Sequence, residues 1–226
     1  MEYLDPVQKQ PQFPQHGANK YHGAVAENYD AKRVNDPKWT TEQIIIEDMI
    51  SELPEGSTVL DCPVGTGRFL PCYIGNGHKF IGMDRSGDML VQSALKLLTE
   101  DQVATWVQAS NERGTILPFQ LRDIGSYLII GDACKTGLND KCVDAAVICR
   151  LTRWLIEEQG PAGIVAMLKE MQRVSRKRII LTVRVENHKW AVSRHLVNSA
   201  LDGWQIARDE RGHEDAYRVL MLEPAC

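Results

Sequence analysis

The chain has 226 residues, a formal net charge of −4 at pH 7, and 43% hydrophobic and 25% charged residues. These values are ordinary for a soluble globular protein, and a chain of this length can bury a good α/β core. The mild acidity excludes a sequence-wide attraction to nucleic acid, and no apolar run is long enough to cross a membrane.

Cysteine usage points to a reducing compartment. The six cysteines show neither Cys-x-x-Cys pairs nor a disulfide-like spacing, and the sequence carries no secretory signal. We therefore expect reduced, mostly buried thiols in a cytoplasmic protein, and no metal site.

The N-terminal 53 residues divide into two parts. Residues 1–20 form a polar arm rich in glutamine and proline. With little to bury, this arm is expected to be mobile unless a partner or the fold pins it. Residues 21–226 are expected to form a single domain. Its first part carries a predicted helix over residues 42–53, with Thr40 or Thr41 as the cap.

A glycine loop follows the first predicted strand. Val59 and Leu60 end a short apolar run, Asp61 follows it, and Gly65 and Gly67 make a loop that a ligand can approach closely. Ligands in open α/β sheets bind outside the carboxyl ends of the strands.

The chemistry of this loop discriminates between ligands. The NAD- or FAD-binding pattern Gly-x-Gly-x-x-Gly is the alternative interpretation, but a phenylalanine and a leucine stand where its third glycine is needed. An acid at position 61 would repel a pyrophosphate and would favour a positively charged amino group or a sulfonium.

A second strand, over residues 79–83, ends in Asp84. An acidic side chain about 20 residues after a glycine loop suits a pair of ribose hydroxyls, because a carboxylate accepts hydrogen bonds from both. A helix over residues 86–98 should follow, with Ser86 as its N-cap.

Residues 99–127 separate this helix from the next strand by more than a compact fold needs. Part of the segment has a helical pattern and part reads as a loop or an irregular strand. It is predicted to be either a substrate-selective insertion or an ordinary helix with ragged ends.

The next apolar run ends in Gly131-Asp132-Ala133. Asp61, Asp84 and Asp132 thus each close a successive predicted strand. Three acids at one rim of a sheet make a negative site, which favours a cationic ligand.

The run Leu-Asp-Cys-Pro-Val-Gly-Thr-Gly-Arg at residues 60–68, together with these strand-end acids, resembles the class I S-adenosylmethionine-dependent methyltransferases. More narrowly, it is similar to the branch whose glycine loop reads Asp-x-Pro-Cys-Gly-Thr-Gly-Arg, with Pro63 at the first glycine of the common family form and Val64 at the branch's cysteine. The resemblance implies a Rossmann-like α/β/α sandwich, with a mostly parallel seven-stranded sheet and an antiparallel C-terminal hairpin. It also implies S-adenosylmethionine as cofactor.

The resemblance assigns residues to the cofactor site. They come from the glycine loop, the strand ends and the fourth strand's exit: Asp61, Pro63, Gly65, Gly67, Arg68, Asp84, Arg85, Met89, Asp132, Ala133 and Cys149. Residues 21–53 would act as a lid in which Tyr29 and Arg33 close the site or hold the methionine carboxylate. An exposed helical arginine is the alternative for Arg33, and a core methionine is the alternative for Met89.

A catalytic residue is not identified. The fourth predicted strand and its exit span residues 143–151 and include Arg150. Trp154 follows, and it stands where the branch has a histidine. Arg150, Trp154 and His188 are weak substrate-site candidates, because each lies near a strand end that faces the methyl group or the substrate entrance in this family. For a lone histidine, a surface or packing role is the alternative.

The C-terminal part is predicted to contain a helix over residues 163–174, a strand over 179–183, a helix over 189–201 and a hairpin made of 204–208 and 217–222.

The expected reaction is methyl transfer by in-line displacement, in which alignment of the reactants supplies most of the rate. The acidic balance and the absence of the Asp/Asn-Pro-Pro-Tyr/Phe motif favour a small-molecule or protein acceptor over duplex DNA. Two alternatives stay open: another adenosylmethionine-using enzyme, such as a lyase or hydrolase, and a non-catalytic binding protein with the same fold.

Overall fold

The computed structural model describes residues 20–185 and 189–225. Except for Lys20, the predicted polar arm lies outside the described residues, as does His188.

Eight strands form one sheet in the order β3-β4-β2-β1-β5-β6-β8-β7. Their bounds are Thr58–Asp61 (β1), Lys79–Asp84 (β2), Phe119–Leu121 (β3), Ser126–Ile130 (β4), Val143–Ile148 (β5), Ser175–Arg184 (β6), Trp204–Arg211 (β7) and Tyr217–Pro224 (β8). Neighbours among β4, β2, β1, β5 and β6 run parallel, whereas β8 is antiparallel to both β6 and β7. The predicted α/β fold, mostly parallel with an antiparallel C-terminal hairpin, is confirmed.

The strand count was wrong by one, because the sheet has eight strands rather than seven. Residues 99–127 contain helix α5 (Glu100–Glu112) and strand β3, which pairs antiparallel with β4 at the sheet edge. The Trp106 indole N–H donates to the Leu117 carbonyl (2.9 Å), and its ring centroid lies 5.4 Å from that of Phe119. A strand of only three residues is too short for its alternation to be recognised in the sequence.

Helices cover both faces of the sheet. Besides α5 they are Ala24–Glu27 (α1), Pro37–Ser51 (α2), Leu70–Gly75 (α3), Gly87–Leu95 (α4), Thr152–Gln159 (α6), Pro161–Val174 (α7) and Arg194–Ala200 (α8). Adjacent strand residues point to opposite faces, so Val59 and Ile180 belong to the core shared with α2 to α5, and Leu60 and Ile179 to the core shared with α6 to α8. The result is the predicted three-layer sandwich.

Helix α2 begins earlier than predicted, and Thr40 and Thr41 do not cap it. Asp36 is the cap, because its carboxylate accepts a hydrogen bond from the Lys38 N–H (3.0 Å). Pro37 takes the first helical position, where its missing N–H is not needed. The predicted cap of α4, the Ser86 side chain, is confirmed.

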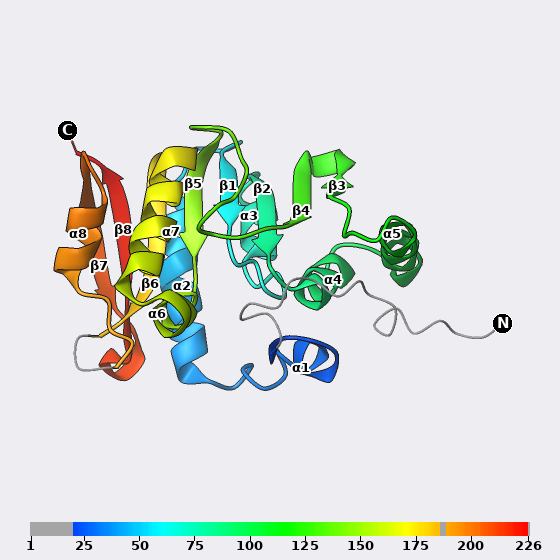
Figure 1. Ribbon diagram of the computed structural model, residues 1–226, viewed down its shortest axis with the longest axis horizontal. Coiled ribbons are helices and arrows are strands. Elements are labelled where there is room, and N and C mark those ends of the chain that lie inside the picture. The colour runs from blue at the N-terminus through cyan, green and yellow to red at the C-terminus, as the bar shows by residue number, and fades with distance from the viewer. Residues whose placement is uncertain (1–19, 186–188, 226) are drawn as a thin grey trace.

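Figure 1 shows the C-terminal hairpin and α8 at one edge of the sheet, and β3, β4 and α5 at the other. Because β1, β2, β4 and β5 are parallel neighbours, their carboxyl ends meet at one rim. Helix α1 and the chain that follows it lie beyond this rim (Figure 1).

Within the described residues, no helix is both long and apolar enough to span a membrane. The cysteines in this part of the chain are free thiols.

Asp144 joins three strands at the opposite end of β5. Its carboxylate accepts a hydrogen bond from the Thr58 N–H (2.9 Å) and pairs with Arg176 (3.1 Å) and Lys177 (3.1 Å). Although burial acts in the other direction, hydrogen bonds from Arg176, Thr58 and Lys177 lower the pKa of Asp144 to about 2.

We predict that Asp144→Asn lowers the free energy of unfolding by about 1–2 kcal/mol at neutral pH, because the charge is lost while the shape is kept. The folded pKa lies below the ordinary value of 3.8, so the ionised group stabilises the fold above that value and the stabilisation is lost as the pH falls toward 2. Urea unfolding should show that the difference in unfolding free energy between the wild type and Asp144→Asn narrows as the pH falls from neutral toward 2. Asp123→Asn, at an exposed position, is the control. A difference that is the same at neutral pH and near pH 2 would contradict the prediction.

Candidate functional site

The glycine loop after β1 is docked onto the neighbouring strand. The Val64 N–H donates to the Met83 carbonyl (2.8 Å). Gly65 and Gly67 have φ angles of +58° and +76°, a region that glycine adopts without steric cost. A Cβ on Gly67 would also lie 2.5 Å from Leu70 Cδ1. Both glycines are therefore required by the loop conformation itself.

Asp84 holds the centre of the rim at the end of β2. Its side chain is 8% exposed, with Oδ2 accepting from the Gly65 N–H (2.9 Å) and Oδ1 from the Ser86 N–H (2.8 Å). Burial raises the pKa of Asp84 to about 6, while the backbone hydrogen bonds act in the other direction. The group is therefore ionised at neutral pH, and each oxygen keeps capacity for a further donor.

Asp61, at the end of β1, differs from Asp84 in its hydrogen bonds and in its pKa. It is 1% exposed, its Oδ2 accepts from the Tyr73 hydroxyl (3.1 Å), and its Oδ1 has no partner in the described part of the chain. Burial raises the pKa of Asp61 to about 8 despite the Tyr73 hydrogen bond. The carboxyl group is thus mostly protonated at neutral pH, and a buried unpaired oxygen is stabilised by any donor that reaches it.

Asp132, after β4, is the most open of the three acids, with 42% of its side chain exposed. Its Oδ1 accepts from the Cys134 N–H (2.8 Å), and its Oδ2 lies 3.9 Å from Arg85 Nε. Arg85 also pairs with Glu158 of α6 (3.3 Å). These contacts link the end of β4 to the opposite wall of the site.

A cavity opens at this rim, and we call it the central cavity. It encloses about 1020 Å³, its open mouth included. The predicted cofactor residues that line it are Tyr29, Pro63, Gly65, Arg68, Asp84, Arg85, Met89, Asp132, Ala133 and Cys149. Asp61, Gly67 and Arg33 are not part of its lining.

The segment before α2 contributes Tyr21 and Tyr29 to the central cavity. Two hydrogen bonds tie this segment to the site: Thr66 Oγ1 donates to Asp30 Oδ1 (2.6 Å), and Ser86 Oγ donates to the Tyr21 carbonyl (2.7 Å). The segment therefore lies where the predicted lid should lie, and its closing movement stays a prediction.

Arg33 packs against this segment instead of entering the central cavity. Its guanidinium carbon lies 3.5 Å from the Tyr29 ring centroid, and Nη1 donates to the Tyr29 carbonyl (2.8 Å). Arg33 lines a second cavity, which shares Tyr21, Tyr29, Arg150 and Trp154 with the central one.

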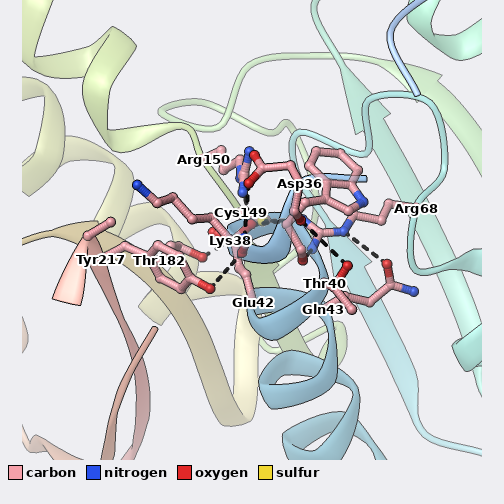
Figure 2. A network of polar contacts seen from close by, with 12 residues as sticks. Asp36, Lys38, Thr40, Glu42, Gln43, Arg68, Cys149, Arg150, Thr182 and Tyr217 are labelled. Atoms are coloured by element: carbon pink, nitrogen blue, oxygen red, sulfur yellow. Dashed lines mark hydrogen bonds and ion pairs between the residues drawn. The ribbon is translucent and has the colours of Figure 1, made fainter. Parts of the chain in front are cut away.

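Figure 2 shows a buried carboxylate between two arginines. Glu42 on α2 is 1% exposed and accepts from Arg68 Nη1 of the glycine loop (2.8 Å) and from Arg150 Nε after β5 (2.5 Å). Arg68 also donates to the Trp39 carbonyl, and its guanidinium carbon lies 3.7 Å from the Trp39 ring centroid. The contacts made by Arg68 therefore serve to hold α2 against the loop.

The exit of β5 brings the remaining candidates to the junction of the two cavities. Burial, with the Glu42 charge adding to it, raises the pKa of the Cys149 thiol well above its ordinary value, so this thiol stays neutral and is a poor nucleophile. Arg150 has a φ of +60°, which is unfavourable for a residue with a Cβ. Trp154 on α6 lines both cavities and meets Tyr21 edge-on at 5.8 Å.

The sequence did not point to Tyr21, Trp39 and Glu158, which line the central cavity, or to Glu42, which lines the second one. Glu42 had a usable signal: it lies four residues before the buried Ile46, on the apolar face of α2. A charged residue on such a face needs a partner, but its partners lie 26 and 108 residues away. No local pattern identifies them.

Comparison with known proteins gives a likeness of fold. No protein-family model matches the sequence, and no curated protein matches it. Among solved structures, a TehB-like SAM-dependent methyltransferase from Corynebacterium glutamicum is 14% identical with a TM-score of 0.57, covering 89% of this chain and 98% of that one. A SAM-dependent methyltransferase from Aquifex aeolicus is 19% identical with a TM-score of 0.53, covering 86% and 97%.

A magnesium protoporphyrin IX methyltransferase from Synechocystis, with bound SAH, is 16% identical with a TM-score of 0.57, covering 91% of this chain and 97% of that one. The chain shares the fold of these three methyltransferases.

We predict that Glu42→Gln lowers the free energy of unfolding by about 3 kcal/mol, because Arg68 and Arg150 then lose the carboxylate that neutralises both. Urea unfolding at neutral pH measures the change. Glu47→Gln, on the same helix, is the matched control, because the one hydrogen bond that the Glu47 carboxylate accepts within the described residues comes from the neutral Gln43 amide (2.8 Å). Equal stability of the two variants would contradict the prediction.

Proposed function

We propose that the protein is an S-adenosylmethionine-dependent methyltransferase. The observation that carries the proposal is Asp84, an ionised carboxylate at the end of β2 whose two oxygens are oriented by the Gly65 and Ser86 N–H groups beside the central cavity. Such a group suits a pair of ribose hydroxyls. The fold that the chain shares with solved methyltransferases supports the same proposal.

The residues around Asp84 fit the rest of the cofactor. Met89 would pack against the adenine, Asp132 would accept from its exocyclic amine, and the Ala133 N–H would reach a ring nitrogen. All three residues line the central cavity. The charge of the methionine ammonium would favour the ionised form of Asp61, whose Oδ1 has no partner among the described residues and would accept a hydrogen bond from it. In this proposal Tyr29 covers the cofactor. Arg33 packs against Tyr29, and Arg68 holds α2 against the glycine loop through Glu42.

The protein has to position its reactants more than activate them. S-adenosylmethionine supplies a methyl group on a positively charged sulfur; the carbon–sulfur bond breaks, its electron pair stays on the sulfur, and the acceptor's lone pair forms the new bond to carbon. In this proposal the site has to hold the attacking atom, the methyl group and the sulfur in line. A general base is needed only if the acceptor must lose a proton before it attacks. The acceptor is a small molecule or a protein, and the reaction takes place in the cytoplasm.

Product analysis separates this proposal from its alternatives. Purified protein is incubated with S-adenosylmethionine and candidate acceptors, and the products are resolved by mass spectrometry. S-adenosylhomocysteine together with a methylated acceptor supports the proposal. Methylthioadenosine would indicate a lyase or related enzyme, and binding without turnover would indicate a non-catalytic protein.

We predict that Asp84→Asn weakens the binding of S-adenosylhomocysteine by at least about tenfold. Hydrogen bonds to a charged group contribute about 1.5–3 kcal/mol each, and tenfold in affinity corresponds to about 1.4 kcal/mol. Calorimetric titration gives the dissociation constant. Asp101→Asn, in the exposed first turn of α5, is the control, and unchanged affinity in folded Asp84→Asn protein would remove Asp84 from the site.

The same carboxylate predicts a pH dependence. Because the pKa of Asp84 in the ligand-free protein is about 6, the affinity of the wild type for S-adenosylhomocysteine should weaken as the pH falls below this value, by up to about tenfold per pH unit. The protonated group has lost its charge and one of its acceptor oxygens. Titrations between pH 5 and pH 8 should show this component in the wild type and not in Asp84→Asn. The same profile in both proteins would contradict the assignment.

A further inference from the structure

The second cavity, beside the central one, is strongly basic, and we call it the basic cavity. It encloses about 870 Å³, its open mouth included. Six basic side chains line it: Lys20, Arg33, Lys38, Arg150, Arg153 and Arg184. Two acidic residues, Asp36 and Glu42, line it as well. Because the whole protein has a net charge of −4, the positive charge of this cavity is a feature of the cavity and not of the protein as a whole.

The two acids do not neutralise this charge. Glu42 already bridges Arg68 and Arg150, and Asp36 caps α2 through its carboxylate. Lys38 finds a partner outside the cavity lining in Glu214 (3.1 Å). Arg153 pairs with Glu157 on the same helix (3.4 Å). Among the described residues, Arg33 and Arg184 are left without a carboxylate.

Arg184 is the clearest of these. Within residues 20–185 and 189–225, neither Arg184 nor Arg33 forms an ion pair, and the hydrogen bond that the Arg184 guanidinium makes goes to the Ala216 carbonyl (3.4 Å). Partial burial and repulsion from Arg150 and Arg153 lower the pKa of Arg184. A half-buried cation beside other cations is stabilised by a bound anion.

The position of the basic cavity relates it to the reaction. It shares Tyr21, Tyr29, Arg150 and Trp154 with the central cavity, so a molecule in one can touch a molecule in the other. Arg184 ends β6, which lies two strands from β1 in the sheet, a spacing of roughly 10 Å between these two strands. Arg184 is therefore on a different strand from those that carry the glycine loop and Asp84, which the proposed function assigns to the cofactor.

We propose that the basic cavity binds the methyl acceptor, and that this acceptor is a small molecule carrying a carboxylate or phosphate group held by Arg184. This inference rests on the proposed function. Tyr21, Tyr29 and Trp154 line the basic cavity beside its cations, as suits a small organic molecule that carries an anionic group. An anion here also lies next to the positively charged sulfonium expected in the central cavity, which favours binding of both.

The test uses the full chain saturated with S-adenosylhomocysteine, so that the place of the methionine carboxylate is already filled. Inorganic phosphate and citrate are titrated at constant ionic strength, and binding is followed by calorimetry. Saturable binding is expected in the wild type, with a dissociation constant about tenfold or more higher in Arg184→Gln, because one charge-assisted contact is lost. Arg184→Lys should retain most of the affinity, since it keeps the charge.

Two further variants keep the test decisive. Arg153→Gln, on α6, should also weaken anion binding and serves if Arg184→Gln fails to fold. Arg113→Gln, at an exposed position after α5, makes the same charge change elsewhere and should bind as the wild type does. Equal affinity of Arg184→Gln and Arg113→Gln would overturn the proposal, as would the absence of saturable binding in the wild type.

Two other outcomes have separate meanings. A 12-nucleotide single-stranded RNA that binds at least tenfold more tightly than phosphate and depends on Arg184 would replace the small-molecule acceptor by a nucleic acid. If S-adenosylhomocysteine itself does not bind the folded protein, the proposed function fails and the acceptor assignment fails with it. If it binds while phosphate and citrate do not, only the present inference is overturned.

Discussion

The arrangement of the site depends on one buried carboxylate, that of Glu42. It receives Arg68 from the glycine loop and Arg150 from the exit of β5, so a single negative charge holds three distant segments together (Figure 2). Two guanidinium groups this close need a shared anion, and removing it leaves charges that the surrounding structure cannot solvate. Because α2 is anchored in this way, the segment before it is directed across the rim of the sheet.

The parallel sheet then imposes its own constraint by collecting the strand ends at one rim. The three acids that it brings there are chemically different although they are all aspartates. Asp61 is buried and mostly protonated at neutral pH, Asp84 is buried but ionised, and Asp132 is open to solvent. The difference follows from burial and from backbone N–H donors, such as those of Gly65 and Ser86, which Asp84 has and which Asp61 lacks within the described residues. One rim thus offers distinct environments to the parts of one ligand.

The two cavities differ in electrostatic character, because three acidic residues and three arginines line the central cavity, whereas six basic and two acidic residues line the basic cavity. Acidic strand ends border the central cavity, whereas cations such as Arg33 and Arg184 line the basic cavity beside it. Under the proposed function a cationic sulfonium and an anionic acceptor would occupy them side by side, so each would bind in the field that favours it. Tyr21, Tyr29, Arg150 and Trp154 line both cavities, so the two ligands would meet beside these four side chains.

The sequence by itself determined the rim, because short-range patterns encode it: short apolar runs mark buried strands, a serine at position 86 caps a helix, and an acid such as Asp84 closes a strand. The layered fold was expected from the resemblance that residues 60–68 and the strand-end acids carry. The sequence did not reveal the edge strand β3, whose three residues are too few to show a period. Only the tertiary structure decided the partners of Glu42, the placement of Arg33 outside the central cavity, and the existence of the basic cavity. Each of these depends on contacts between residues far apart in the chain, such as the 108 positions that separate Glu42 from Arg150, and no local pattern of residues carries that information.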